Sequence, residues 1–98
     1  MNLDPLIHAP IRLAILSVLI SVESAKFTFL KDATGATDGN LSTHLTKLEK
    51  SGYIKISKTF ENKKPQTSCA LTKKGREAFE KYLGQLETLV RMRHGGDA

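Results

Sequence analysis

The first part of the chain carries apolar residues at helical spacing. Beginning at Pro10, which suits the first position of a helix, they recur on one side at every third or fourth position as far as Val22. A second apolar row, made of Leu13, Leu16 and Ile20, runs along another side of the same segment. A helix that is apolar on most sides must be covered on most sides. In a chain this short, we expect a second subunit to supply part of that cover.

Two more helices are expected directly afterwards, joined by a very short link. Thr28 is predicted to cap the first of them, and Gly35 to end it, because glycine readily adopts the left-handed backbone of a helix end. Thr37 then caps the next helix, which is expected over residues 38–51 and is closed by Gly52. So short a link between two helices is typical of a helix-turn-helix.

Beyond this point the apolar period changes from that of a helix to that of a strand. Residues 53–60 alternate between apolar and polar, and a second strand is expected at residues 66–71. Residues 61–65 between them form a charged turn. Thr72 is predicted to cap a last helix that runs to about Met92. The predicted fold is mainly α with a small β-hairpin: a winged helix-turn-helix with three helices, a two-stranded wing and a C-terminal dimerisation helix.

The third predicted helix has one apolar and one polar side. Leu41, Leu45 and Leu48 form its buried side, because they fall at helical spacing. Short polar side chains and lysines lie around the other side, where short groups let the backbone approach base edges and lysines reach phosphates. We predict that this side contacts DNA through Gly39, Asn40, Ser42, Thr43, Thr46, Lys47 and Lys50. The alternative is a merely solvated helix face.

Gly39 strengthens the case for a ligand on this side. Glycine inside a helix costs roughly 1 kcal/mol relative to alanine. That cost is understandable if a phosphate or a base edge lies against the bare backbone at Gly39.

The predicted hairpin supplies a second basic surface. Lys58 shares strand parity with Ile54 and Ile56, so strict alternation points it inward unless the strand has already left the core. A projecting wing meets that condition, and it would lie along the backbone or minor groove of a duplex. The residues predicted to contact DNA from the wing are Lys58, Lys63, Lys64, Gln66 and Thr67. The alternative is a charged hairpin tip that serves only solubility.

Composition is compatible with a DNA partner. The chain has 98 residues, which we interpret as one domain spanning 1–98, and 15 Lys and Arg against 10 Asp and Glu give a net charge of +5. A small basic domain suits a polyanion. The most apolar stretch, residues 13–22, is shorter than the ~20 residues of a membrane span, so we expect a soluble, cytoplasmic protein with no membrane partner.

The residue types that support catalysis or metal binding show no productive spacing. His8, His44 and His94 are scattered, and the single cysteine, Cys69, excludes an internal disulfide and a thiolate zinc site. No nucleophile elbow, phosphate loop or paired-carboxylate pattern occurs. We therefore expect no enzyme, metal or cofactor. Cys69 is expected to be buried rather than a redox switch, and His44 to pack or hydrogen-bond rather than contact a phosphate.

Four segments together resemble the small winged-helix transcriptional regulators of the MarR-like, ArsR-like and PadR-like families. They are residues 10–16 of the first helix, 37–54 of the third helix and following strand, 58–67 of the wing, and 71–76 after it. The resemblance covers most of residues 10–83.

The resemblance implies a homodimer that places two recognition helices in successive major grooves and usually represses transcription. It implies that the matching positions of the third helix contact bases or phosphates. It also implies that Lys63 and Lys64 contact DNA from the wing. The chain lacks the helix cysteines of metal-sensing ArsR-like members and the longer helices around the effector pocket of larger MarR-like members. A small-molecule effector is therefore not supported.

The apolar stripe of the last helix reaches further than a small head domain can cover. We predict that it packs on its own counterpart and on the first helix in a two-fold interface, which calls for a pseudo-palindromic operator. The predicted interface residues are Leu13, Leu16, Ile20, Tyr82, Leu86, Leu89 and Val90. The competing hypothesis is a winged-helix protein-interaction adaptor without specific DNA binding.

Overall fold

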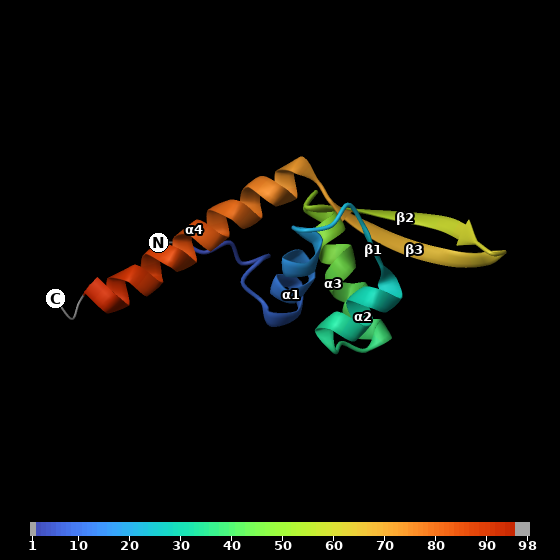
Figure 1. Ribbon diagram of the computed structural model, residues 1–98, viewed down its shortest axis with the longest axis horizontal. Coiled ribbons are helices and arrows are strands. Elements are labelled where there is room, and N and C mark those ends of the chain that lie inside the picture. The colour runs from blue at the N-terminus through green and yellow to red at the C-terminus, as the bar shows by residue number, and fades with distance from the viewer. Residues whose placement is uncertain (1, 96–98) are drawn as a thin grey trace.

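Three helices surround the inner end of a long β-hairpin, and a fourth helix extends from it in the opposite direction (Figure 1). The computed structural model describes residues 2–95. We call the first three helices and the inner end of the sheet the head. The helices are α1 (Pro10–Leu19), α2 (Phe27–Thr34), α3 (Asp38–Lys50) and α4 (Lys73–Gly95), and the strands are β1 (Ala25–Lys26), β2 (Ile54–Glu61) and β3 (Lys64–Leu71).

Helix α1 is shorter than its apolar pattern predicts. It ends at Leu19 rather than Val22, and Val22 is 40% exposed. The N–H groups of Ser21 and Val22 make tight turn bonds instead, to the carbonyls of Val18 (3.4 Å) and Leu19 (3.5 Å). The chain has to turn here because Ala25 pairs with a distant strand.

That pairing makes the sheet three-stranded, whereas the sequence predicted only two strands. β1 pairs antiparallel with β3, with Ala25 opposite Cys69 and Lys26 opposite Ser68, in the order β1-β3-β2. Two residues are too few to show alternation, so the sequence pattern carries no sign of this strand.

The short strand also displaces the start of α2. The predicted cap at Thr28 is wrong, because α2 begins at Phe27 and its N-cap residue, Lys26, makes no side-chain cap bond. The predicted end is confirmed, since Gly35 has a left-handed backbone with φ of 69°.

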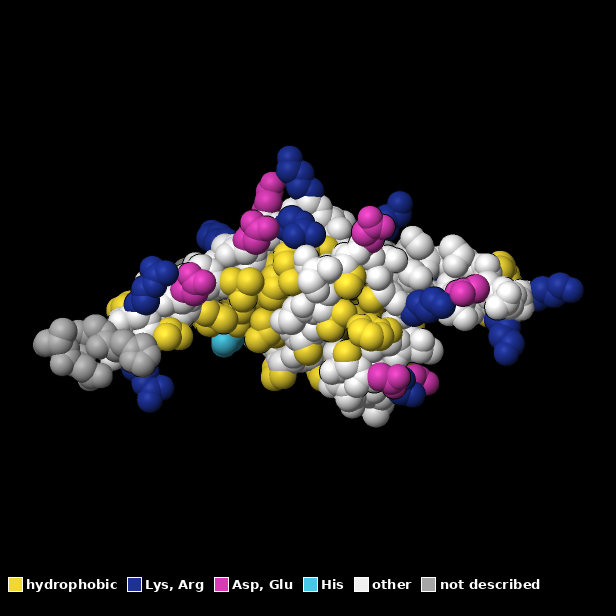
Figure 2. All heavy atoms as spheres, viewed as in Figure 1, with side chains coloured by type: hydrophobic (Ala, Val, Ile, Leu, Met, Phe, Trp, Pro, Cys, Tyr) yellow, Lys and Arg dark blue, Asp and Glu magenta, His cyan; other side chains and the backbone are white. Residues whose placement is uncertain are grey.

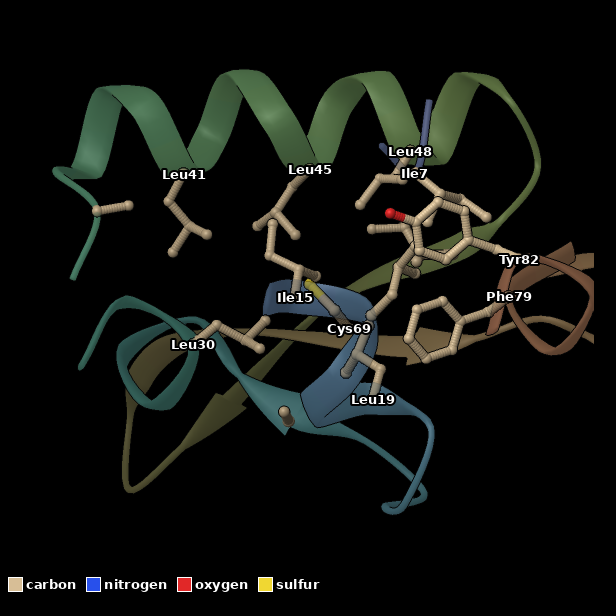
Figure 3. Packing of buried hydrophobic residues seen from close by; sticks show 14 residues of the cluster. Ile7, Ile15, Leu19, Leu30, Leu41, Leu45, Leu48, Cys69, Phe79 and Tyr82 are labelled. Atoms are coloured by element: carbon tan, nitrogen blue, oxygen red, sulfur yellow. The ribbon is translucent and has the colours of Figure 1, made fainter. Parts of the chain in front are cut away.

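Helix α3 agrees closely with prediction. The Thr37 hydroxyl accepts a hydrogen bond from the Asn40 N–H at 3.2 Å, which is the predicted cap. Leu41, Leu45 and Leu48 are at most 2% exposed. Figure 3 shows these three side chains directed from α3 toward the other helices and the sheet.

The predicted cap of α4 also joins the helix to the loop before β2. The Thr72 hydroxyl accepts from the Gly75 N–H (3.0 Å) and donates to the Gly52 carbonyl (2.6 Å). The backbone N–H of Thr72 donates to the Tyr53 carbonyl at 3.0 Å. A Cβ at Gly75 would lie 2.0 Å from that carbonyl oxygen, so only glycine permits this contact. The start of α4 is thereby fixed relative to the end of α3.

Two residues predicted at a dimer interface belong to the core of this chain. Leu16 is 0% and Tyr82 1% exposed, so neither offers surface to a partner. Tyr82 packs beside Phe79 in the first half of α4 (Figure 3), and its hydroxyl lies 2.7 Å from His8 Nδ1. Helical spacing alone did not distinguish the part of α4 that covers the head from the part beyond it.

No helix within residues 2–95 is both long and apolar enough to span a bilayer.

Candidate nucleic-acid interface

The polar side of α3 is open to solvent along its whole length. All of its predicted contact residues, from Gly39 to Lys50, are exposed. Two of the hydroxyls are held by the helix itself: Thr43 donates to the Gly39 carbonyl and Thr46 to the Ser42 carbonyl, each at 2.9 Å. Because the hydroxyl protons are used within the helix, each hydroxyl can offer an incoming ligand only the acceptor lone pairs of its oxygen.

Packing within the chain does not require the glycine at position 39. A Cβ added to Gly39 would meet nothing within 4 Å, and its φ is not positive. Glycine inside a helix lowers its stability by about 1 kcal/mol relative to alanine. At position 39, no contact within the described part of the chain explains why alanine is absent. The bare backbone of α3 at Gly39 is therefore open to close approach by an external molecule.

The wing is a regular two-stranded ribbon that leaves the core early. Asn62 and Lys63 form its two-residue turn, with φ of 52° and 64°, so the turn is tighter than the predicted five-residue one. Burial decreases along β2 from Ile54, which is 2% exposed, to Phe60, which is 80% exposed. Lys58 is exposed, so the inward parity of its position is tolerated as predicted.

The wing residues divide between the two faces of the ribbon. Residues directly opposite each other on paired strands share a face, and the faces alternate along the strands. Lys58 and Thr67 are opposite each other and share the face of Ile56, which is partly buried and packs against the core. Gln66 and Lys64 lie on the other face, opposite Thr59 and Glu61. The predicted wing contacts therefore do not form a single cluster.

A groove joins α3 to the wing. It is open and has a volume of about 450 Å³, and it is lined by Phe27, Ser42, Leu45, Thr46, Glu49, Ile56, Lys58 and Thr67. Ser42 and Thr46 also line a shallow depression on the outer side of α3, together with Thr43, Lys47 and Lys50. Because the two hollows share Ser42 and Thr46, the polar side of α3 and the inner face of the wing form one continuous surface.

Sequence reasoning missed two contacts that set the orientation of the wing. The Glu49 carboxylate of α3 accepts a hydrogen bond from the Ile56 N–H of β2 at 3.3 Å. On the other face, Lys26 Nζ lies 2.7 Å from Glu61 Oε2 and ties β1 to the end of β2. Both contacts join elements that periodicity describes separately, so no sequence signal indicated them.

His44 has the hydrogen-bonding role expected for it. Its Nδ1 lies 3.0 Å from Nη1 of Arg12, whose other terminal nitrogen donates to the Pro5 carbonyl at 3.2 Å. Partial burial, and then the charges of Arg12 and Lys47, lower the pKa of His44 below its ordinary value of 6.5. The neutral imidazole therefore accepts from Arg12 and helps to fix α3 against α1.

Mild acid should destabilise the protein through His44. Its pKa is higher in the unfolded chain than in the folded one, so the free energy of unfolding falls as the pH drops below about 6.5 and levels off below the folded pKa. Urea unfolding at about pH 7.5 and about pH 5.5 measures this loss. In His44→Gln, which keeps a side-chain acceptor, the loss should be smaller. Equal losses in both proteins would contradict the assignment.

Cys69 is buried in the core, as predicted. Burial, with a smaller contribution from Glu49, raises the pKa of its thiol to about 11. The thiol is therefore protonated near neutral pH and is a poor nucleophile. Across residues 2–95, no group of three or more His, Cys, Asp or Glu side chains is arranged to hold a metal ion.

The chain matches a family and resembles solved structures over most of its length. A model of the winged helix DNA-binding domain matches residues 11–90. An uncharacterized protein of Methanocaldococcus jannaschii is 35% identical over 79 residues, which are 81% of this chain and 86% of that protein. A transcriptional regulator homologue from Pyrococcus horikoshii has a TM-score of 0.82 and 28% identity, covering 88% of this chain and 85% of its own.

A regulator of the MarR family from Porphyromonas gingivalis also has this fold, with a TM-score of 0.66 and 22% identity over 91% of this chain and 82% of its own. The predicted winged helix and its likeness to MarR-like regulators are confirmed by these matches. The chain belongs to the winged helix DNA-binding domain family.

Proposed function

We propose that this protein is a sequence-specific transcriptional repressor that binds double-stranded DNA as a homodimer and catalyses no reaction. Residues 1–98 act as one domain, with α3 in the major groove and the wing on the adjacent backbone or minor groove. The observation that carries the proposal is the continuous surface from Lys47 and Lys50, through Ser42 and Thr46, to Lys58. Short polar groups near base edges with lysines around them match the chemistry of a duplex.

The outer half of α4 supports a dimer. Its exposed apolar side chains are Leu83 (39%), Leu89 (41%), Val90 (55%) and Met92 (64%). Leu83, Leu86 and Val90 line a shallow apolar hollow. Figure 2 shows hydrophobic side chains gathered where α4 meets the head. Covering these α4 side chains with the same side chains of a second copy gives a two-fold interface, to which the half-buried Leu13 of α1 and Ile20, directly after it, contribute.

Two-fold symmetry has a consequence for the DNA site. Each protomer presents its own α3, so the operator should be pseudo-palindromic, with half-sites about one helical turn apart. Because Thr72, at the start of α4, is hydrogen-bonded to Gly52 and Tyr53 in the loop that follows α3, the dimer contact and the spacing of the two recognition helices are mechanically linked.

Selection of bound duplexes from a genomic pool tests the function. The selected sites should share a pseudo-palindrome, and the protein should bind them at least ~10³-fold more tightly than random duplex, with affinity that falls steeply with salt. Light scattering should give the mass of a dimer at micromolar concentration. A monomer, or equal affinity for selected and random duplexes, would refute the proposal.

Asn40 and Thr43 should determine sequence preference. Replacing either with alanine removes a group close to the bases, so we expect about 1–3 kcal/mol less discrimination at one operator position and little change on random duplex. Fluorescence anisotropy on a set of single-base operator variants measures this. Ser51→Ala, at the far end of the helix, is the matched control. Uniform weakening across all sequences would assign these side chains to the DNA backbone instead.

A further inference from the structure

Phe60 is a large aromatic side chain that the fold leaves uncovered. It is 80% exposed, the highest value among the large hydrophobic residues described. Its cross-strand partner is Pro65, so the two form an apolar pair on one face of the outer wing. Single exposed hydrophobic residues are common, and exposure alone would not indicate a role. The position of the pair does.

The register of the wing aligns Phe60 with the DNA-facing groove. Residues two apart along a strand share a face, so Phe60 is on the same face as Lys58. Lys58 and its partner Thr67 line the groove together with Ser42 of α3. A duplex held against α3 and Lys58 therefore meets Phe60 about 7 Å further along the strand.

The charges around Phe60 favour a polyanion. Lys58 lies on its inner side, and Lys63 and Lys64 lie at the tip, where Figure 2 shows basic side chains. The acidic residue next to it in sequence, Glu61, is on the opposite face, and its carboxylate is paired with Lys26 at 2.7 Å. The wing strands therefore place no acidic residue on the face that carries the ring, and the groove's own acidic residue, Glu49 of α3, is bonded to the Ile56 N–H four residues before Phe60.

We propose that Phe60, supported by Pro65, is a wedge residue that enters the minor groove beside the major-groove site and partly unstacks one base step. This rests on the duplex binding proposed above and adds to it a bent operator. An apolar side chain inserted at a base step kinks the duplex and brings more of it against the protein. The flanking lysines would hold the phosphates on either side of that step.

The test uses the full chain and an operator duplex selected by the wild-type protein. Phe60→Thr removes the ring and keeps a residue that favours strands. We expect it to weaken operator binding by at least about 10-fold and to abolish DNA bending, measured by energy transfer between dyes at the duplex ends. It should also abolish the fluorescence increase of 2-aminopurine placed at the contacted step.

Two further variants sharpen the test. Phe60→Leu retains an apolar wedge and should retain most of the bending. Thr59→Ala, one residue away on the opposite face, should leave affinity and bending unchanged. A Phe60→Thr variant that binds and bends DNA like wild type would overturn the wedge while the proposed function stands.

Failure of the wild-type protein to bind any duplex would overturn both proposals. Loss of self-association, or of binding to anionic vesicles, in Phe60→Thr with unchanged DNA bending would assign the ring to another partner and would also overturn the wedge.

Discussion

Replacing Gly75 by alanine should cost about 2–4 kcal/mol of the free energy of unfolding. The new Cβ would lie 2.0 Å from the carbonyl oxygen and 2.8 Å from the carbonyl carbon of Tyr53. Both are backbone atoms, so no side-chain rotation relieves the clash. The start of α4 has to move away, and the bonds of Thr72 to Gly52 and Tyr53 weaken with it. Urea unfolding followed by circular dichroism measures the loss.

Gly84, in the same helix, provides the matched control. A Cβ at Gly84 would meet nothing within 4 Å, so Gly84→Ala should instead stabilise the chain by about 1 kcal/mol. Similar effects of the two substitutions would show that the contact between Gly75 and Tyr53 does not determine stability.

The Gly75 contact has a functional side as well. It joins the last helix to the loop that follows the recognition helix, so a shift at Gly75 would change the angle between α3 and α4. In a dimer held together through α4, that angle sets the separation of the two α3 helices. We expect any Gly75→Ala protein that remains folded to bind the operator more weakly, while its affinity for random duplex changes little.

The second large effect is expected at the tip of the wing. Lys63→Ala combined with Lys64→Ala should lower operator affinity by roughly 10- to 100-fold at moderate salt and lower random-duplex affinity similarly, because phosphate contacts are independent of sequence. The slope of log K against log salt should decrease by about 0.9 for each phosphate that the variant no longer neutralises. Anisotropy titrations across a range of salt concentrations measure both quantities.

A double variant of equal charge controls for net charge alone. Lys73→Ala with Lys81→Ala changes two exposed lysines of α4, outside the groove between α3 and the wing. It should leave the salt slope almost unchanged. If the wing variant binds like wild type, the wing does not contact the duplex.

Local periodicity identified the parts of the site that lie within single elements. The three leucines of α3 are at helical spacing, and Thr37 is one residue before the helix, so both the buried side and the exposed polar side followed from neighbouring residues. The alternation in β2 likewise indicated the wing and the unusual place of Lys58. These interactions are between residues close in sequence, which is why the sequence alone was enough.

Tertiary contacts decided what periodicity left open. Only the pairing of Ala25 with Cys69 creates β1 where α1 was expected to continue, and only the packing of separate helices and strands encloses Leu16 and Tyr82 in the core. The amino-acid pattern by itself determined the order of the four helices and the two wing strands, the polar side of α3 and the basic wing, because each depends on neighbours within one turn or one strand. The groove between α3 and the wing was decided by the folded chain, because its walls come from distant segments that meet only through long-range packing.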